Sequence, residues 1–157
     1  IMVRRNSTFI SIDTQARSLN RDRKGTCQRT GNESLVWEGW ITPGPLSDRY
    51  RVRMTYQLGF NPRVEVLSPK LELAEGKKEI PHMYNQKRLC LHYPKYREWT
   101  PKKLLSKTII PWISDWLDHY ESWLATGEWL GGGIEQAPLP IVARIDESIE
   151  SNHITKH

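Results

Sequence analysis

Three segments between residues 35 and 66 alternate apolar and polar side chains with a period of two, which is typical of half-buried β-strands. The first places Trp37, Gly39 and Ile41 on one face and ends at a Pro-Gly-Pro turn at 43–45. The second alternates Val52, Met54, Tyr56 and Leu58 with Arg51, Arg53, Thr55 and Gln57. After a Gly-Phe-Asn-Pro turn at 59–62, the third puts Val64 and Val66 inward. We predict an antiparallel meander of about four strands.

A period of 3.6 residues replaces this alternation after residue 108. The apolar positions form one stripe over nearly five turns: Ile109, Ile113, Trp116, Leu117, Tyr120, Trp123 and Leu124. Thr108 or Ser106 can cap the start, Pro111 is tolerated in the first turn, and Gly127 supplies a stop. The pattern predicts a helix over 109–126 that backs the sheet in an α/β (α+β) domain. A mixed stretch at about 14–23 predicts a shorter helix after the alternating residues 9–12.

The connection between these regions, residues 67–98, contains three prolines and no sustained periodicity. A connection of this length in a compact domain tends to be functional or to include short strands, and 89–93 is a candidate for one. It contains Cys90, whose polar neighbours are His82, Asn85, Lys87, Arg88 and His92. This concentration of polar groups makes Cys90 the leading candidate for chemistry.

The chemistry expected of Cys90 is that of a nucleophilic thiolate, because nearby positive charge favours the ionised thiol. Lys87, Arg88 and His92 can lower the pKa of the thiol, and His82 or Asn85 can donate a hydrogen bond to an oxyanion. Alternation with its two flanking leucines would turn the Cys90 side chain outward if those leucines belong to the core. The alternative is that Cys90 is simply a small buried residue of the structure. For Cys27 we favour that structural interpretation, because Thr26 and Gln28 provide no activating groups.

Composition narrows further the classes of protein to which the chain can belong. The chain has 157 residues, enough for one domain with its own core, and two cysteines, too few for a disulfide framework. Together with a start that lacks a secretory apolar stretch and no run of about 20 apolar residues, this favours a cytoplasmic protein. Two distant cysteines and scattered histidines lack metal-ligand spacing, and the glycines at 131–133 are not followed by Lys-Ser/Thr, so no metal or cofactor is expected.

The net charge of +5 is distributed unevenly, with basic residues in the first thirty positions and at 87–107 and acidic ones at 115–150. A basic surface suits either phosphate or an acidic protein partner. The chain has no zinc-knuckle spacing and no recognisable helix-turn-helix or aromatic sheet motif, so a nucleic-acid-binding module is the weaker reading. The stripe of Trp112, Trp116 and Trp123 is interpreted as core or as a partner surface.

The order of these features resembles the ubiquitin-conjugating enzyme fold: a leading helix, a meander, a loop with His and Asn before Leu-Cys-Leu, a tryptophan nine residues on, and a helix. More narrowly, three segments resemble the bacterial ubiquitin-conjugating-like proteins of CBASS-type antiphage operons with cGAS/DncV-like nucleotidyltransferases. They are Arg-Leu-Cys-Leu-His-Tyr-Pro at 88–94, Thr-Ile-Ile-Pro-Trp at 108–112 and the aromatic 120–129 with its Gly-rich exit. The resemblance is strongest over 35–133, so we expect a domain at 1–133 and a polar extension at 134–157 with one short element at 139–145.

The resemblance implies that Cys90 accepts an acyl group as a thioester and passes it to an amine. His82 and Asn85 stand in place of the family's His-Pro-Asn element, although His82 lies where the eukaryotic pattern has its asparagine. Trp99 matches the family's tryptophan after the active site, mainly a packing residue, and with Lys87 and Arg88 it is a candidate for partner binding. The implied partner is the nucleotidyltransferase of the same operon, joined through its C-terminal carboxylate. The alternatives are a catalytically silent scaffold that binds a protein partner and a basic nucleic-acid-binding module.

Overall fold

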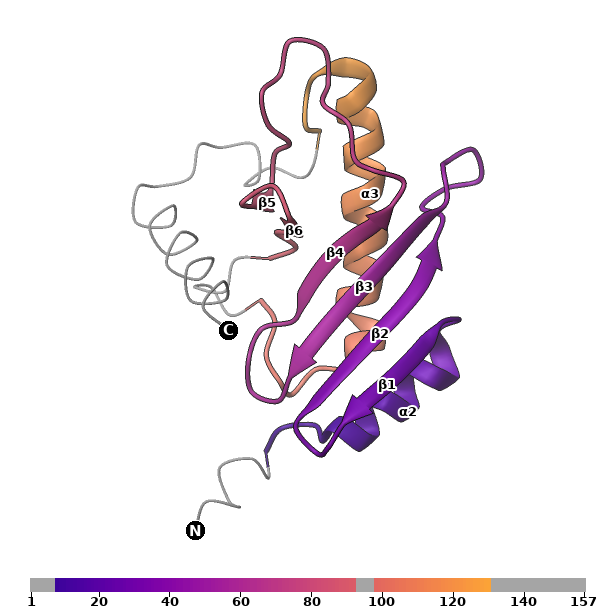
Figure 1. Ribbon diagram of the computed structural model, residues 1–157, viewed down its shortest axis with the longest axis vertical. Coiled ribbons are helices and arrows are strands. Elements are labelled where there is room, and N and C mark those ends of the chain that lie inside the picture. Colours follow the sequence, from indigo (N-terminus) through magenta and orange to yellow (C-terminus); the bar gives the residue numbers. More distant parts are fainter. Residues whose placement is uncertain (1–7, 93–97, 131–157) are drawn as a thin grey trace.

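The structure, a computed structural model, describes residues 8–92 and 98–130. The elements are α2 (Ile12–Asp22), β1 (Thr26–Thr30), β2 (Ser34–Ile41), β3 (Tyr50–Gln57), β4 (Arg63–Ser68), β5 (Met83–Tyr84), β6 (Arg88–Leu89), the 3-10 turn η2 (Leu105–Lys107) and α3 (Ile109–Thr126). Strands β1 to β4 pair antiparallel in chain order, and β5 and β6 form a separate two-stranded pair (Figure 1). The predicted α+β class and four-stranded antiparallel meander are confirmed.

The three strands predicted from alternation are β2, β3 and β4, with the expected faces. In β3, Val52 and Met54 are buried while Arg51 and Arg53 are exposed, and β2 likewise buries Trp37. The fourth strand, β1, was missed by the alternation because four of its five residues are exposed and polar side chains line both faces. It is an edge strand held by backbone pairing to β2, from Thr26↔Glu38 to Thr30↔Ser34.

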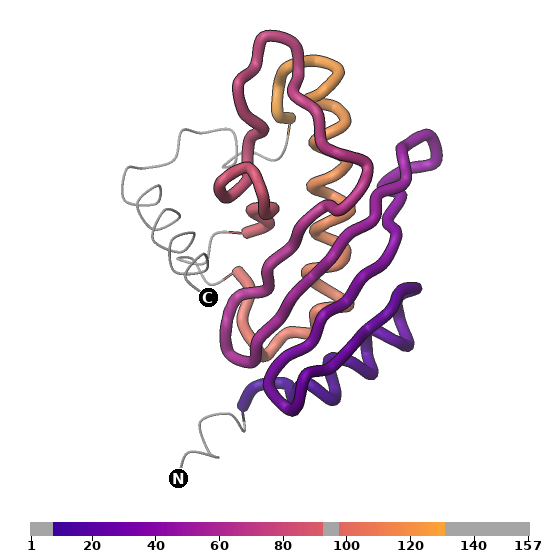
Figure 2. The backbone as a smooth tube through the Cα atoms, viewed as in Figure 1, coloured from indigo at the N-terminus to yellow at the C-terminus, as the bar shows by residue number. Residues whose placement is uncertain are grey.

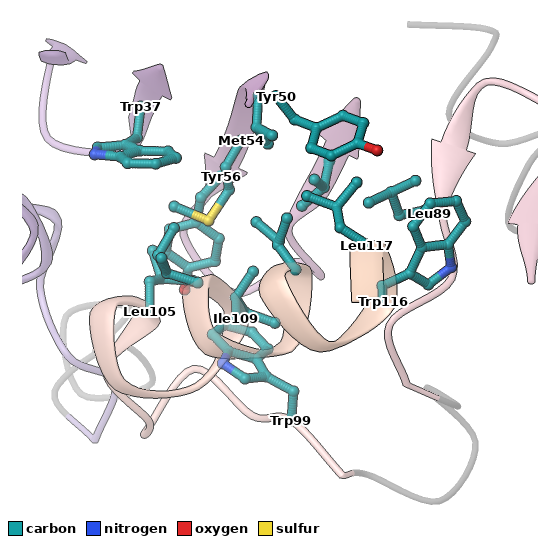
Figure 3. Close-up of a cluster of buried hydrophobic side chains, with 14 of the residues drawn as sticks. Trp37, Tyr50, Met54, Tyr56, Leu89, Trp99, Leu105, Ile109, Trp116 and Leu117 are labelled. Carbon is teal, nitrogen blue, oxygen red and sulfur yellow. The ribbon is translucent and has the colours of Figure 1, made fainter. Parts of the chain in front are cut away.

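Helix α3 lies against one face of the sheet and spans the predicted residues 109–126 (Figures 1 and 2). The core fills the space between them, where strand side chains such as Met54 and Tyr56 meet Ile109 and Leu117 of the helix (Figure 3). Thr108 occupies the cap position as predicted, but its hydroxyl does not cap the helix. It donates to the Leu104 carbonyl at 2.8 Å and accepts from Trp99 Nε1 at 3.1 Å, which seats the loop before the helix.

The N-terminal helix α2 begins two residues earlier than predicted, at Ile12, because Ser11 caps it by accepting the Thr14 N–H at 3.1 Å. Its buried face holds the segment that leads into α3. The Gln15 side chain donates to the Lys103 carbonyl at 2.9 Å and accepts the Leu105 N–H at 2.9 Å. Because the buried Leu105 N–H needs an acceptor away from water, the amide fixes the approach to α3.

After β4 the chain runs alongside the C-terminal half of α3 and returns to the short β5–β6 pair (Figure 2). The Glu72 N–H donates to the Tyr120 hydroxyl at 2.7 Å, which ties this connection to the helix. No helix within residues 8–92 and 98–130 is long and apolar enough to cross a membrane. The glycines at 131–133, the predicted extension at 134–157 and its element at 139–145 lie outside the described residues.

Candidate active site

A hairpin of two short strands joined by the three residues 85–87 positions the cysteine. Strands β5 and β6 pair Met83 with Leu89 and Tyr84 with Arg88, and the Lys87 N–H donates to the Tyr84 carbonyl at 2.9 Å. Asn85 and Gln86, the central residues of the turn at 84–87, both adopt left-handed conformations, with φ of 51° and 55°, as a type I′ turn requires. Asparagine tolerates this conformation well, and Gln86 is held by a pair of hydrogen bonds to the backbone of Ile80, at 2.6 Å and 2.9 Å.

Cys90 is the first residue after β6, and its N–H donates to the His82 carbonyl at 2.9 Å. The Cys90 side chain is only 9% exposed, which corrects the expectation that it faces outward. The strand ends at Leu89, so the alternation that would have turned Cys90 away from the core does not extend through it. Its Sγ lies 3.5 Å from the Tyr84 hydroxyl oxygen and 3.6 Å from the His92 carbonyl oxygen.

The remaining exposed part of Cys90 belongs to the wall of a pocket of about 350 Å³. The lining residues come from the hairpin, from the loop before α3, from one face of α3 and from the segment after it: His82, Cys90, Leu91, Glu98, Trp112, Asp115, Trp116, His119 and Trp129. The pocket therefore joins a thiol to two imidazoles, two carboxylates and three indoles. Among the described residues no group of three or more His, Cys, Asp or Glu side chains is arranged to hold a metal ion.

The aromatic wall is connected to the hairpin by direct contacts. Trp116 Nε1 donates to the His82 carbonyl at 3.0 Å, so the same oxygen accepts from both Cys90 and the helix. Gly127 ends α3 in a left-handed conformation, φ 78°, and the chain turns back so that the Trp129 ring centroid lies 5.0 Å from that of His82, 5.4 Å from Trp116 and 5.9 Å from His119.

The two predicted partners of Cys90 occupy different places. His82 lines the pocket, and its φ of 55° is unusual for a residue other than glycine. Asn85 is exposed at the tip of the hairpin and does not line the pocket. Tyr84, which the sequence did not single out as a partner of Cys90, presents its hydroxyl to the thiol instead.

The three residues expected to bind a partner differ in how exposed they are. Lys87 is exposed on the hairpin turn, whereas Arg88 is 9% exposed, with its guanidinium 4.9 Å from the centroid of the Tyr84 ring. Trp99 is 3% exposed and packs edge-on against Tyr56 at 5.5 Å. Burial leaves Trp99 little surface for a partner, so we interpret it as a core residue.

His92 is buried, with its ring 5.9 Å from that of Trp112. Burial, with a smaller contribution from the positive charge of Lys103, lowers the pKa of His92 to about 4. At neutral pH the imidazole is therefore uncharged, which corrects the expectation that His92 supplies positive charge to the Cys90 thiol. Burial raises the pKa of Cys27, and the nearby Arg29 only partly offsets this, which fits the structural role expected for that cysteine.

Sequence reasoning missed the polar residues that α3 contributes to the pocket. Asp115 and His119 are separated by four residues, as are Trp112 and Trp116, so each pair lies on one face of the helix. That spacing, beside the aromatic stripe, was the available signal. Glu98 had no comparable signal, because its place in the pocket depends on the path of the loop between the hairpin and α3.

The antiparallel four-stranded sheet backed by α3, with a cysteine in a pocket just beyond the sheet, defines a protein of the E2-like α+β class. The family model of the Type II CBASS E2 protein matches residues 15–137, and the chain belongs to this family. The match confirms the resemblance and extends it at both ends, to include most of α2. Membership places the protein among bacterial antiphage defence proteins that work within a CBASS operon. No curated protein matches the chain significantly.

Proposed function

We propose that this protein is a conjugating enzyme that carries the carboxyl terminus of a partner protein as a thioester on Cys90 and transfers it to an amine. The observation that supports this most is the position of the Cys90 thiol, on the wall of a pocket that also contains two histidines and two carboxylates. Family membership supports the same chemistry, since the chain belongs to an E2-type family.

In the loading step, the Cys90 sulfur attacks the carbonyl carbon of an activated carboxyl group, either a thioester on an activating enzyme or an acyl adenylate. The C–S bond forms, the bond to the leaving thiolate or nucleotide breaks, and the thiol proton passes to a base or to solvent. The Tyr84 hydroxyl, 3.5 Å from Sγ, and the His82 side chain are the polar groups we propose for stabilising the oxyanion.

The partner we propose is the nucleotidyltransferase of the same CBASS operon, linked through its C-terminal carboxylate. This part rests on the family alone. The test is coexpression of the two proteins followed by intact-mass spectrometry with and without dithiothreitol. Cys90→Ala should abolish every thiol-sensitive adduct, while Cys27→Ala, the matched control, should keep them. Cys90→Ser should not turn over, but it can trap a more stable oxyester. Adducts that persist in Cys90→Ala would refute the proposal.

The roles of the residues near Cys90 can be separated by three variants. Tyr84→Phe and His82→Gln should each slow adduct formation by about 10²- to 10³-fold if each donates to the oxyanion. Asn85→Gly keeps the left-handed turn and should have little effect, because Asn85 does not line the pocket. A large loss in Asn85→Gly with normal Tyr84→Phe and His82→Gln would assign the oxyanion contact to Asn85 instead.

A second function, a silent scaffold that binds a protein partner, is favoured by one observation: Cys90 is only 9% exposed. Iodoacetamide labelling of the folded protein distinguishes the two. The conjugating enzyme should be alkylated at Cys90 at a measurable rate without denaturant, whereas a scaffold with an inert thiol should be labelled there only after unfolding.

A nucleic-acid-binding module has less support. Five arginines of the described residues are within ion-pair distance of a carboxylate: Arg17, Arg21, Arg29, Arg51 and Arg53. Glu38 alone binds both Arg51 and Arg53 on the open face of the sheet, which reduces the positive charge available there for phosphate.

A further inference from the structure

Helix α3 presents a carboxylate and an imidazole to the pocket from one face. Asp115 and His119 both line it and lie four residues apart, where side chains on a helix are neighbours. His119 is half-buried and Asp115 exposed, so the pair spans the wall from its interior to its rim. Because both side chains project from a long helix packed on the sheet, their positions are set by rigid structure rather than by a loop.

The pair lines the same pocket as the thiol. The His119 ring contacts Trp129, the Trp129 ring contacts His82, and the His82 carbonyl accepts the Cys90 N–H. His119, Trp129, His82 and Cys90 all line the same cavity, so an acyl group bonded to Cys90 shares that cavity with His119.

The charges of the pocket favour a cationic ligand. Its titratable groups are Cys90, His82, Glu98, Asp115 and His119, which include two carboxylates and no lysine or arginine. A lysine side chain arrives at neutral pH as an ammonium ion, with a pKa of about 10.4, and cannot attack a carbonyl until it loses a proton. Carboxylates at the rim attract the ammonium, and an imidazole further in can take its proton.

We infer that His119 is the general base for transfer to a lysine-type amine, and that Asp115 attracts the ammonium form of that amine to the pocket. This rests on the proposed thioester at Cys90. His119 first takes one proton from the incoming ammonium. The neutral amine nitrogen then attacks the thioester carbonyl carbon and the N–C bond forms. The C–S bond breaks, and the second N–H proton passes to the departing sulfur, so that Cys90 leaves as the thiol. The imidazolium then returns its proton to solvent.

The test loads Cys90 without any partner, using the mercaptoethanesulfonate thioester of N-acetylglycine as the acyl donor. After the excess donor is removed, discharge of the adduct is followed by intact mass with either Nα-acetyllysine or hydroxylamine as the acceptor. Hydroxylamine is already unprotonated at neutral pH and needs no base, so it measures the reactivity of the thioester itself.

His119→Gln and His119→Asn should load normally and discharge to Nα-acetyllysine at least about 10²-fold more slowly at pH 7. The defect should shrink as the pH approaches 10 and be absent with hydroxylamine. Asp115→Asn should raise the Nα-acetyllysine concentration needed for half-maximal rate, while Asp118→Asn, an exposed carboxylate on the same helix that does not line the pocket, should not.

The base assignment is overturned if both His119 variants discharge to Nα-acetyllysine as fast as the wild type at pH 7. It is also overturned if they are equally slow with both acceptors at every pH, which would indicate a structural role. A pH-dependent defect in His82→Gln alone would move the base to His82. If wild-type Cys90 does not load at all, the proposed conjugating function fails and the role of His119 fails with it.

Discussion

Protonation of His92 should destabilise the folded protein as the pH falls. The imidazole is buried beside Trp112 and next to Cys90, and burial, followed by the charge of Lys103, lowers its pKa from 6.5 to about 4. Its Nδ1 has no hydrogen-bond partner among the residues that the structure describes. An added proton would therefore place an uncompensated charge in the core. Because the unfolded chain accepts that proton more readily, acid favours unfolding.

The magnitude follows from the two pKa values. Between pH 6.5 and 4 the unfolded state binds the proton and the folded state does not, so stability falls throughout this window and the loss levels off below it. The full cost is about 3 kcal/mol, and at pH 5 the cost relative to pH 8 is about 2 kcal/mol. A loss of this size is a large fraction of the stability of an ordinary domain.

The assay is urea unfolding followed by tryptophan fluorescence at pH 8, 6 and 5, for the wild type and for His92→Leu. The variant cannot titrate at this position, so its stability relative to the wild type should rise by about 2 kcal/mol between pH 8 and pH 5. Partners lower the pKa of Asp22 and Glu38, so acid also weakens those contacts, but equally in both proteins, and the difference cancels this effect. A difference that changes by less than about 0.5 kcal/mol would refute the assignment of His92 as a buried neutral histidine.

Three further predictions concern the fold that supports the site. Leu117→Ala should lower the free energy of unfolding by about 2–5 kcal/mol, because Leu117 is fully buried. The control Asp118→Ala, at an exposed position, should change it by less than about 0.5 kcal/mol. Similar effects of the two variants in urea unfolding would contradict the packing of α3. Gln15→Met should cost about 1–3 kcal/mol, since the buried Leu105 N–H loses its acceptor, and an unchanged melting temperature would show that this hydrogen bond is not needed. Gly127→Ala should cost about 1–2 kcal/mol through its positive φ, and Gly127→Asn should cost less; equal melting temperatures for Ala and Gly would rule out the strained cap.

Local pattern predicted most of the fold because most elements are amphipathic. The stripe from Ile109 to Leu124 predicted α3 to its observed bounds, and alternation in β3 predicted both of its faces. Strand β1 was missed because an edge strand can be polar throughout: its stability comes from hydrogen bonds to β2, and backbone pairing leaves no period in the sequence. The start of α2 was shifted because Ser11 acts as a cap, a role that depends on the direction of the incoming chain.

For the site, the sequence singled out Cys90 and His82 as candidates, and both line one pocket. Their chemistry is visible in the residue types, and their nearness follows from the short hairpin. The sequence named Asn85 as a candidate and did not single out Tyr84, since the turn geometry decides which of the two side chains lies near the thiol. It also assigned His92 a charge that burial removes, because desolvation depends on what packs around the ring.

The sequence by itself determined the class of the protein and most of the helices and strands that build it, and it singled out Cys90 as the candidate nucleophile, because these depend on periodicities and residue types within short segments. The tertiary structure alone decided that Asp115, His119 and Trp129 share a cavity with Cys90. Twenty-five or more positions separate Cys90 from each of these residues along the chain, and only the packing of α3 against the hairpin, with the turn at Gly127, brings them together.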